Sequence, residues 1–237
     1  MRRKIGTMLI LAVALWICPG LSLASTGFAA CSEDTLILPA FHNRLPAFTG
    51  VDVLIDAGHG GIDSGTVSGT IAEKDINLAI AQKTYKNLQK MGYRTVLNRI
   101  GDYALSNENG WLRIRSRHKK DLAQRSHLAG EIKPKLMLSL HVNASRRSSI
   151  RGPLMLHQKN EQSKPLATIL QNTLNPLYGV DEKPRYGRTY YLLRHTKVPT
   201  VIVEMGFLTN PQDRDLLTRP DGQEQIARLI CKGLRPI

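Results

Sequence analysis

Four side chains in this sequence are of the types that hold a catalytic metal ion and move protons beside it: His59, Glu73, His141 and Glu204. Two imidazoles and one carboxylate suit a catalytic zinc ion, because such sites use three protein ligands and leave a fourth position for water. Zinc lowers the pKa of that water to about 7. A second carboxylate that does not bind the metal can then take the proton. This set of residues is the one needed for metal-assisted amide hydrolysis.

The pattern of apolar runs places these residues at one edge of a sheet. Three short runs are typical of buried strands, and each is followed by one of the four residues. Sites in open α/β sheets form outside the carboxyl ends of the strands. Parallel strands would therefore bring these residues together, and Glu73 lies at the predicted start of a helix on the same edge. The runs and residues are 51–56 with His59, 136–140 with His141, and 198–203 with Glu204.

Helical patterns alternate with these strand patterns. The spacing predicts a further strand at 93–97 and helices at 73–91, 119–129 and 164–178. Gly92 and Gly130 are expected to end the first two helices, and Asp221 with Glu224 forms a predicted capping box for a last helix. Almost continuously apolar strands that alternate with helices indicate the α/β class. We expect a single three-layer domain with a mostly parallel central sheet flanked by helices.

Glycines surround the first histidine of the set. Gly58, Gly60 and Gly61 let the backbone turn sharply on both sides of His59. A glycine-rich loop after a strand can also bind phosphate, but this loop matches neither the dinucleotide fingerprint nor the P-loop. Nucleotide binding is therefore disfavoured.

Four segments resemble the zinc-dependent N-acetylmuramoyl-L-alanine amidases of the amidase type 3 family. They are DAGHGGID at 56–63, EKDINL at 73–78, SLHVNA at 139–144 and VEMGFLTN at 203–210. The resemblance runs from about Val51 to the C-terminus, with the segments in the family's order. It implies that His59, Glu73 and His141 bind one zinc ion per chain and that Glu204 is catalytic. It also implies hydrolysis of the amide between N-acetylmuramic acid and L-alanine in peptidoglycan.

A finer resemblance concerns the subgroup. Residues 115–125 resemble the germination-specific amidases of spore formers, which implies a role in spore cortex or in cell-wall remodelling. The stretch 145–190 is short and lacks the helical insertion that blocks the site in division amidases, so that subgroup and its activator-controlled regulation are disfavoured. Asn98-Arg99 stands where the family more often has Thr-Arg, a change outside the proposed metal site. The sequence does not identify an activating partner.

The N-terminus has the pattern of an export signal. Three basic residues precede an apolar run at 8–18, and small residues follow at 22–24. The apolar run is shorter than the ~20 residues that span a bilayer. We expect a protein that is secreted or held in the cell envelope, although an uncleaved anchor and lipidation at Cys31 stay open. The expected division is a signal peptide at 1–24, a linker at 25–50 and a zinc amidase catalytic domain at 51–237.

The charge of the chain suggests an anionic partner. The formal net charge is +14, of which 1–24 contributes three positive charges and no negative ones. Export favours peptidoglycan, with peripheral wall or membrane association through the basic surface. Export and the low aromatic content of 5% disfavour a nucleic-acid partner. Of two basic runs, 113–120 and 146–151, the second follows His141 closely and is expected to border the cleft.

Several polar residues carry weaker predictions. Asp56 and Asp63 could each orient a ligand histidine, and capping of the glycine loop is an equally good interpretation. Cys231 is expected to be a small buried residue on the last helix, and a disulfide with Cys31 has no support. The remaining histidines are expected at the surface or in local hydrogen bonds; they are His42, His118, His127, His157 and His195.

Two other functions use the same residues differently. A related zinc peptidase would act on the peptide stems, because one scaffold can host several hydrolases. A non-catalytic wall-binding protein is the other alternative. The complete set of four residues argues against it, since a decayed enzyme is expected to have lost a ligand.

Overall fold

The computed structural model describes residues 50–235, so the expected signal peptide and linker lie outside the described residues. A six-stranded sheet forms the centre of the domain, in the order β4-β1-β5-β8-β6-β7. All neighbouring strands are parallel except β6, which runs antiparallel to β8. The strands are β1 (Val53–Ala57), β4 (Thr95–Leu97), β5 (Leu136–Asn143), β6 (Leu154–His157), β7 (Arg185–Tyr186) and β8 (Thr200–Phe207). The prediction of a mostly parallel sheet is confirmed.

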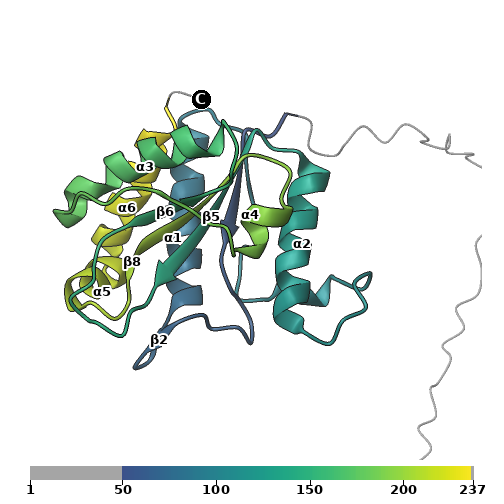
Figure 1. Ribbon diagram of the computed structural model, residues 1–237, viewed down its shortest axis with the longest axis horizontal. Coiled ribbons are helices and arrows are strands. Elements are labelled where there is room, and N and C mark those ends of the chain that lie inside the picture. The colour runs from purple at the N-terminus through teal and green to yellow at the C-terminus, as the bar shows by residue number, and fades with distance from the viewer. Residues whose placement is uncertain (1–49, 236–237) are drawn as a thin grey trace, which may run out of the picture. The chain divides into compact units, whose positions relative to one another are not determined.

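Helices cover both faces of this sheet (Figure 1). One face packs against α1 (Glu73–Lys90), α3 (Ser163–Tyr178) and α6 (Pro220–Gly233). The other face packs against α2 (Arg117–Ile132) and the short α4 (Tyr191–His195). A further helix, α5 (Pro211–Thr218), contacts α6 and β8. These three layers confirm the predicted fold class.

The apolar side chains of each central strand alternate between two cores. Val53 and Ile55 belong to the larger cluster, whereas Leu54 between them belongs to the cluster beneath α2 and α4. Burial on both faces explains why these strands are almost continuously apolar. Cys231 is 3% exposed and lies in the larger cluster, so the prediction of a buried cysteine on the last helix is confirmed.

Two predicted helix boundaries are wrong, and one is confirmed. Gly92 follows Met91, the C-cap residue of α1, and its φ of +88° is the left-handed conformation that glycine adopts readily. Helix α2 continues past Gly130 and ends at a left-handed Lys133, with a φ of 50°. Helix α6 begins at Pro220 with no side-chain cap, so the predicted capping box does not form. Glu224 instead accepts hydrogen bonds from Arg228 and from α1.

The elements that the sequence did not predict are short. Besides β6, β7, α4 and α5, they are a hairpin of β2 (Val67–Ser68) and β3 (Ile71–Ala72) and a 3-10 turn at Leu105–Asn107. Elements of two to eight residues contain too few apolar positions to reveal a period. None of the helices in the described part of the chain has the length and apolarity required to cross a bilayer.

Candidate metal centre and active site

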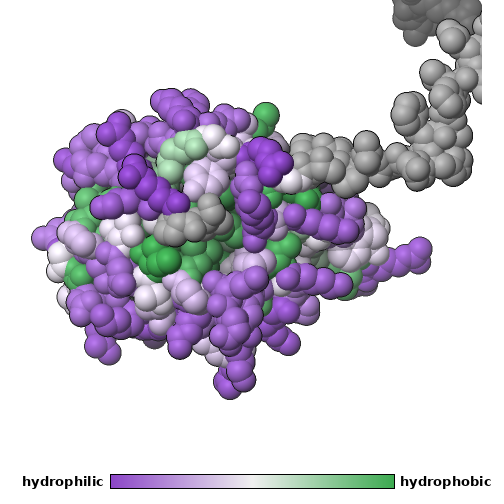
Figure 2. All heavy atoms as spheres, turned by 90° about the horizontal axis from the view of Figure 1, so that it is seen from above, coloured by the Kyte–Doolittle hydropathy of each residue, from purple (hydrophilic) through white to green (hydrophobic). Residues whose placement is uncertain are grey.

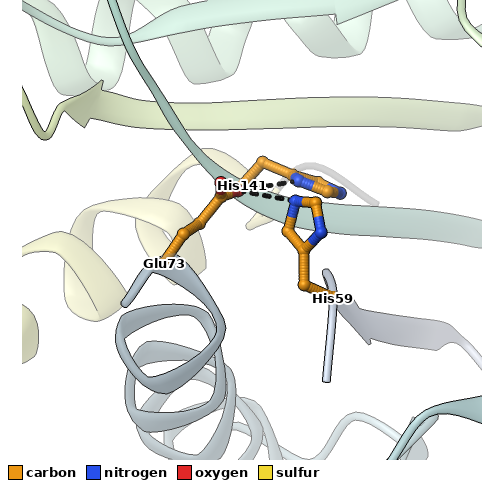
Figure 3. A group of neighbouring side chains, drawn as sticks. All are labelled: His59, Glu73 and His141. Carbon is orange, nitrogen blue, oxygen red and sulfur yellow. Dashed lines mark hydrogen bonds and ion pairs between the residues drawn. The ribbon is translucent and has the colours of Figure 1, made fainter. Parts of the chain in front are cut away.

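Three of the four predicted site residues point toward one another at the carboxyl edge of the sheet (Figure 3). His59 lies in the loop after β1, Glu73 is the first residue of α1, and His141 lies in β5. Each offers one nitrogen or oxygen atom, and these three atoms all lie within 4.8 Å of one another. The two imidazole rings meet edge to face, with centroids 4.9 Å apart.

The spacing of these atoms fits a divalent metal ion. Glu73 Oε1 lies 3.2 Å from His59 Nε2 and 3.0 Å from His141 Nδ1. Ligands bound at the usual zinc distances in a tetrahedral arrangement lie about 3.4 Å from one another. The two distances from Glu73 are therefore close to the spacing of zinc ligands. Two imidazoles and a carboxylate also form the donor set expected for zinc.

The carboxylate of Glu73 is surrounded by hydrogen-bond donors. Beyond the two histidines, Oε1 accepts from the backbone N–H of Val142 at 3.0 Å and from the Asn77 amide at 3.2 Å. Oε2 accepts from the backbone N–H of Thr66 at 2.8 Å. Burial opposes ionisation, but the bonds from His141 and His59 outweigh it and hold the pKa of Glu73 well below its usual range. Glu73 therefore stays charged, as a metal ligand must.

His59 is held in an unusual backbone conformation. Its φ of 60° is left-handed, which is uncommon for a residue with a side chain. Its Nδ1 lies 2.9 Å from Asp63 Oδ2, so Nε2 faces Glu73. Burial lowers the pKa of His59, but Glu73 and Asp63 outweigh this effect and raise it to about 9. Both interpretations of Asp63 are supported, because its Oδ2 contacts this histidine while its Oδ1 accepts from the backbone N–H of Gly65 at 3.1 Å.

Close approach at this edge requires a glycine before His59. A Cβ atom at Gly58 would clash with the imidazole ring of His141. The glycine therefore lets the loop after β1 pass directly beside β5, which brings the two histidines together.

A buried polar network fixes the loop that carries His59. Arg125 on α2 is 2% exposed and donates to Asp56 Oδ1 at 2.6 Å, to Asp121 Oδ2 at 2.5 Å and to the carbonyl oxygen of His59 at 2.7 Å. Asp56 contacts no histidine, so the prediction that it could orient one is wrong. It anchors Arg125 instead, and the arginine holds the backbone of His59.

The Asn98-Arg99 pair belongs to the same network. Asn98 accepts a hydrogen bond from the backbone N–H of Ala57 at 2.9 Å, and Arg99 donates to the carbonyl of Gly58 at 3.1 Å. Both side chains are buried. They lie outside the group of three, as expected, yet they support the loop next to it. From the sequence, Arg99 is noted only in the Asn98-Arg99 pair and Arg125 only in the segment 115–125. No buried network is predicted, because two buried arginines leave no periodic pattern in a sequence.

The group of three opens into a cleft of about 630 Å³. Glu204 on β8 lines it, and the register of the sheet pairs this residue with His141. Both residues were expected to follow their strands. They lie within the strands instead, because β5 and β8 extend several residues beyond the apolar runs. The polar and aromatic residues that line the cleft include Thr66, His118, Lys119, Asn143, Tyr190 and Tyr191.

Glu204 has a different environment from Glu73. Its carboxylate has no hydrogen-bond partner among residues 50–235, and the residue is 7% exposed. Burial raises the pKa of Glu204 to about 7, and the charge on His141 offsets only part of that rise. A carboxyl group with a pKa near 7 can both accept and donate a proton at neutral pH, which suits general acid–base catalysis.

The basic run that borders the cleft is the first one, and not the second one as predicted. His118 and Lys119, from the first run, line the cleft. The run at 146–151 is not among the residues that line it, and Arg151 pairs with Asp213 and Gln212 on α5. Seen from above in Figure 2, the domain presents mainly hydrophilic side chains around a smaller apolar area.

The other histidines lie in local contacts, as expected. His157 is buried and its Nδ1 lies 2.7 Å from the carbonyl oxygen of Gln158. His127 and His195 lie beside aromatic rings, and Nδ1 of His118 lies 3.6 Å from Oδ2 of Asp63. His42 lies outside the described residues.

Comparison with known proteins decides the family. The family model of the N-acetylmuramoyl-L-alanine amidases matches residues 53–236. The chain belongs to this family. The amidase resemblance read from the four sequence segments is thereby confirmed.

Three amidase relatives give the extent of the similarity. The germination-specific N-acetylmuramoyl-L-alanine amidase of Bacillus subtilis is 31% identical over 78% of this chain and 79% of its own length. The CwlD amidase of Clostridioides difficile, solved in complex with the GerS lipoprotein, has a TM-score of 0.73 and 30% identity, over 79% of this chain and 98% of that one. The catalytic domain of the amidase CwlV of Bacillus (Paenibacillus) polymyxa has a TM-score of 0.66 and 32% identity, over 78% and 97%.

Proposed function

We propose that residues 51–237 form the catalytic domain of a peptidoglycan hydrolase that cleaves the amide between N-acetylmuramic acid and L-alanine. Membership of the amidase family supports the reaction. The convergence of His59, Glu73 and His141 within 4.8 Å supports a bound metal ion and carries the proposal. These three residues would hold one zinc ion per chain.

When bound, zinc supplies a Lewis acid that polarises a carbonyl group and lowers the pKa of water to about 7. Glu204 accepts a proton from the attacking water and delivers it to the amine of L-alanine as the amide breaks. Asp63 holds the His59 ring so that Nε2 faces the centre, and the network around Arg125 holds the backbone of the same residue. The cleft beside Glu204 receives the substrate.

The biological setting follows from the relatives. Similarity to a germination-specific amidase supports action on spore cortex, and similarity to cell-wall amidases supports a place in the cell envelope. A related amidase was solved with a lipoprotein, which supports a protein partner in the envelope for this chain. The excess of basic residues favours association with the anionic wall.

The first prediction tests the chemistry and the role of Glu204 together. Purified peptidoglycan is digested with the wild type and with Glu204→Gln, and the products are identified by mass spectrometry. The wild type should release whole stem peptides that begin with L-alanine. The variant should keep one zinc ion per chain and lose at least about 100-fold in rate, because it cannot transfer the proton. Glu161→Gln is the matched control, because Glu161 is an exposed glutamate that does not line the cleft.

Two outcomes would contradict the proposal. A peptide stub left on the sugar would identify a peptidase that cuts within the stem. Full activity of Glu204→Gln on peptidoglycan would remove Glu204 from the mechanism while leaving the metal group in place.

A further inference from the structure

A second cavity of about 410 Å³ lies between α2 and α4, beside the catalytic cleft. Tyr191, the first residue of α4, lines both cavities. This second cavity, called the groove below, therefore adjoins the cleft at Tyr191. Nothing in the proposed mechanism uses this second cavity, whose lining contains four side chains with rings: Trp111, His127, Tyr191 and His195.

The rings form two pairs, and the two rings of each pair pack against each other. Trp111 packs against His127 with centroids 5.4 Å apart, and its indole N–H donates to Gln124 at 3.2 Å. Tyr191 stacks on His195 with centroids 4.1 Å apart and an angle of 28°. Trp111 stays 54% exposed despite these contacts. A large exposed ring that is fixed by a hydrogen bond and a partner offers contact area at little entropic cost.

The chemistry of the lining matches a carbohydrate. The C–H groups on the face of a pyranose ring pack well on aromatic rings, and its hydroxyl groups require hydrogen-bonding partners. Ser126, Glu131, Lys133 and Lys197 supply polar groups at the same cavity. Aromatic side chains combined with polar groups that fix orientation are typical of a small-molecule site.

We propose that this groove binds the glycan strand of peptidoglycan on the sugar side of the scissile bond. The inference rests on the proposed amidase function. The amide that is cut hangs from a muramic acid within a polysaccharide, so further sugars must leave the cleft in some direction. The groove adjoins the cleft at Tyr191 and presents aromatic rings on which sugar rings pack well.

Two measurements test this inference. The first is binding of peptide-free glycan strands to zinc-loaded full-length protein, which does not depend on catalysis. Trp111→Ala should weaken this binding at least about fivefold, as truncation of a central aromatic contact does in other interfaces. Trp111→Phe, which keeps a ring, should restore most of it. Tyr186→Ala removes a ring of similar exposure, 49%, outside both cavities and should have no effect.

The second measurement is hydrolysis of two substrates. Trp111→Ala should raise the KM for polymeric peptidoglycan while kcat stays unchanged, and it should act normally on a single muramoyl peptide. Zinc content should also stay at the wild-type value. Unchanged glycan binding in Trp111→Ala, or equal losses on both substrates, would overturn the groove assignment. A wild type that binds glycan strands through Trp111 but releases no stem peptides would instead refute the proposed reaction and leave the groove intact.

Discussion

Glu73 and Glu204 line the same cleft, yet their surroundings differ in almost every respect. Glu73 begins α1 and accepts hydrogen bonds from two histidines, two backbone N–H groups and one amide. Glu204 lies within β8, and its carboxylate has no hydrogen-bond partner in the described residues. Burial works against the charged form of both carboxylates, but only Glu73 has donors that outweigh it.

This difference assigns two tasks to one type of side chain. A pKa well below the usual range keeps Glu73 ionised and ready to bind a metal ion, whereas a pKa of about 7 lets Glu204 exchange a proton at neutral pH. Pairs of carboxyl groups with separated pKa values mark acid–base assignments in other hydrolases. The arrangement of donors, rather than the residue type, therefore distinguishes ligand from proton carrier.

The largest effect that tests this comparison is expected for Glu73→Gln. The amide would bring an N–H group toward histidine nitrogens and backbone donors, and it would remove the charge that the metal requires. Zinc affinity should fall by more than about 100-fold, beyond the losses seen when an outer hydrogen-bond partner is removed. Competition with a chromophoric chelator measures this affinity.

Glu204→Gln serves as the matched control for Glu73→Gln, because it makes the same chemical change in the same cleft. It should keep wild-type zinc affinity. Equal zinc affinity in both variants would show that the two carboxylates do not have separate tasks.

A smaller effect is expected for Asp63→Asn, which tests how far the polar support of the metal group extends. Asp63 accepts from Nδ1 of His59, and the amide of asparagine would offer a donor to that nitrogen instead. Zinc affinity should fall by about 10–100-fold, the usual range for such outer partners. The folded state should survive, because Asp63 is partly exposed.

Asp102→Asn provides the control in the same region. Asp102 contacts Lys74 and the backbone of Gly61, but not His59. Its substitution should leave the zinc affinity unchanged. A similar loss in both variants would mean that loop stability, rather than ring orientation, determines metal binding.

Much of this site could be predicted from the sequence because its residues lie beside strong local patterns. Apolar strands, a glycine loop and an amphipathic helix predict that His59, Glu73 and His141 lie at one edge of the sheet. The exact position of His141 and Glu204 within their strands was missed. Polar residues at the carboxyl ends interrupt the apolar run, although β5 and β8 continue through them.

The supporting network could not be predicted in the same way. Arg125 contacts Asp56 across 69 positions of sequence, and a single chain gives no pattern for such a pairing. Arg125 enters the sequence-based predictions only as part of the segment 115–125 that resembles the germination-specific amidases, and no role is predicted for it. The ring pairs beside α4 were missed for a related reason, since α4 is five residues long and Trp111 lies in a loop.

The smallest effect is expected for Asp52→Asn. The partners of Asp52 also lower its pKa, but none of them is a proposed metal ligand. Arg94 holds the pKa of Asp52 below its usual range, with a smaller contribution from Lys135. Both partners are 61% exposed, so the loss of unfolding free energy at pH 7 should be at most about 1 kcal/mol. Because the folded pKa is lowered, this stabilisation is full above the unfolded pKa of about 4 and is lost as the pH falls through the folded pKa.

Urea unfolding of the wild type and of Asp52→Asn at pH 7 and at pH 3 measures the difference in unfolding free energy. This difference should shrink at pH 3, and zinc affinity at pH 7 should stay at the wild-type value. A changed zinc affinity would contradict the prediction that the lowered pKa of Asp52, unlike that of Glu73, plays no part in metal binding.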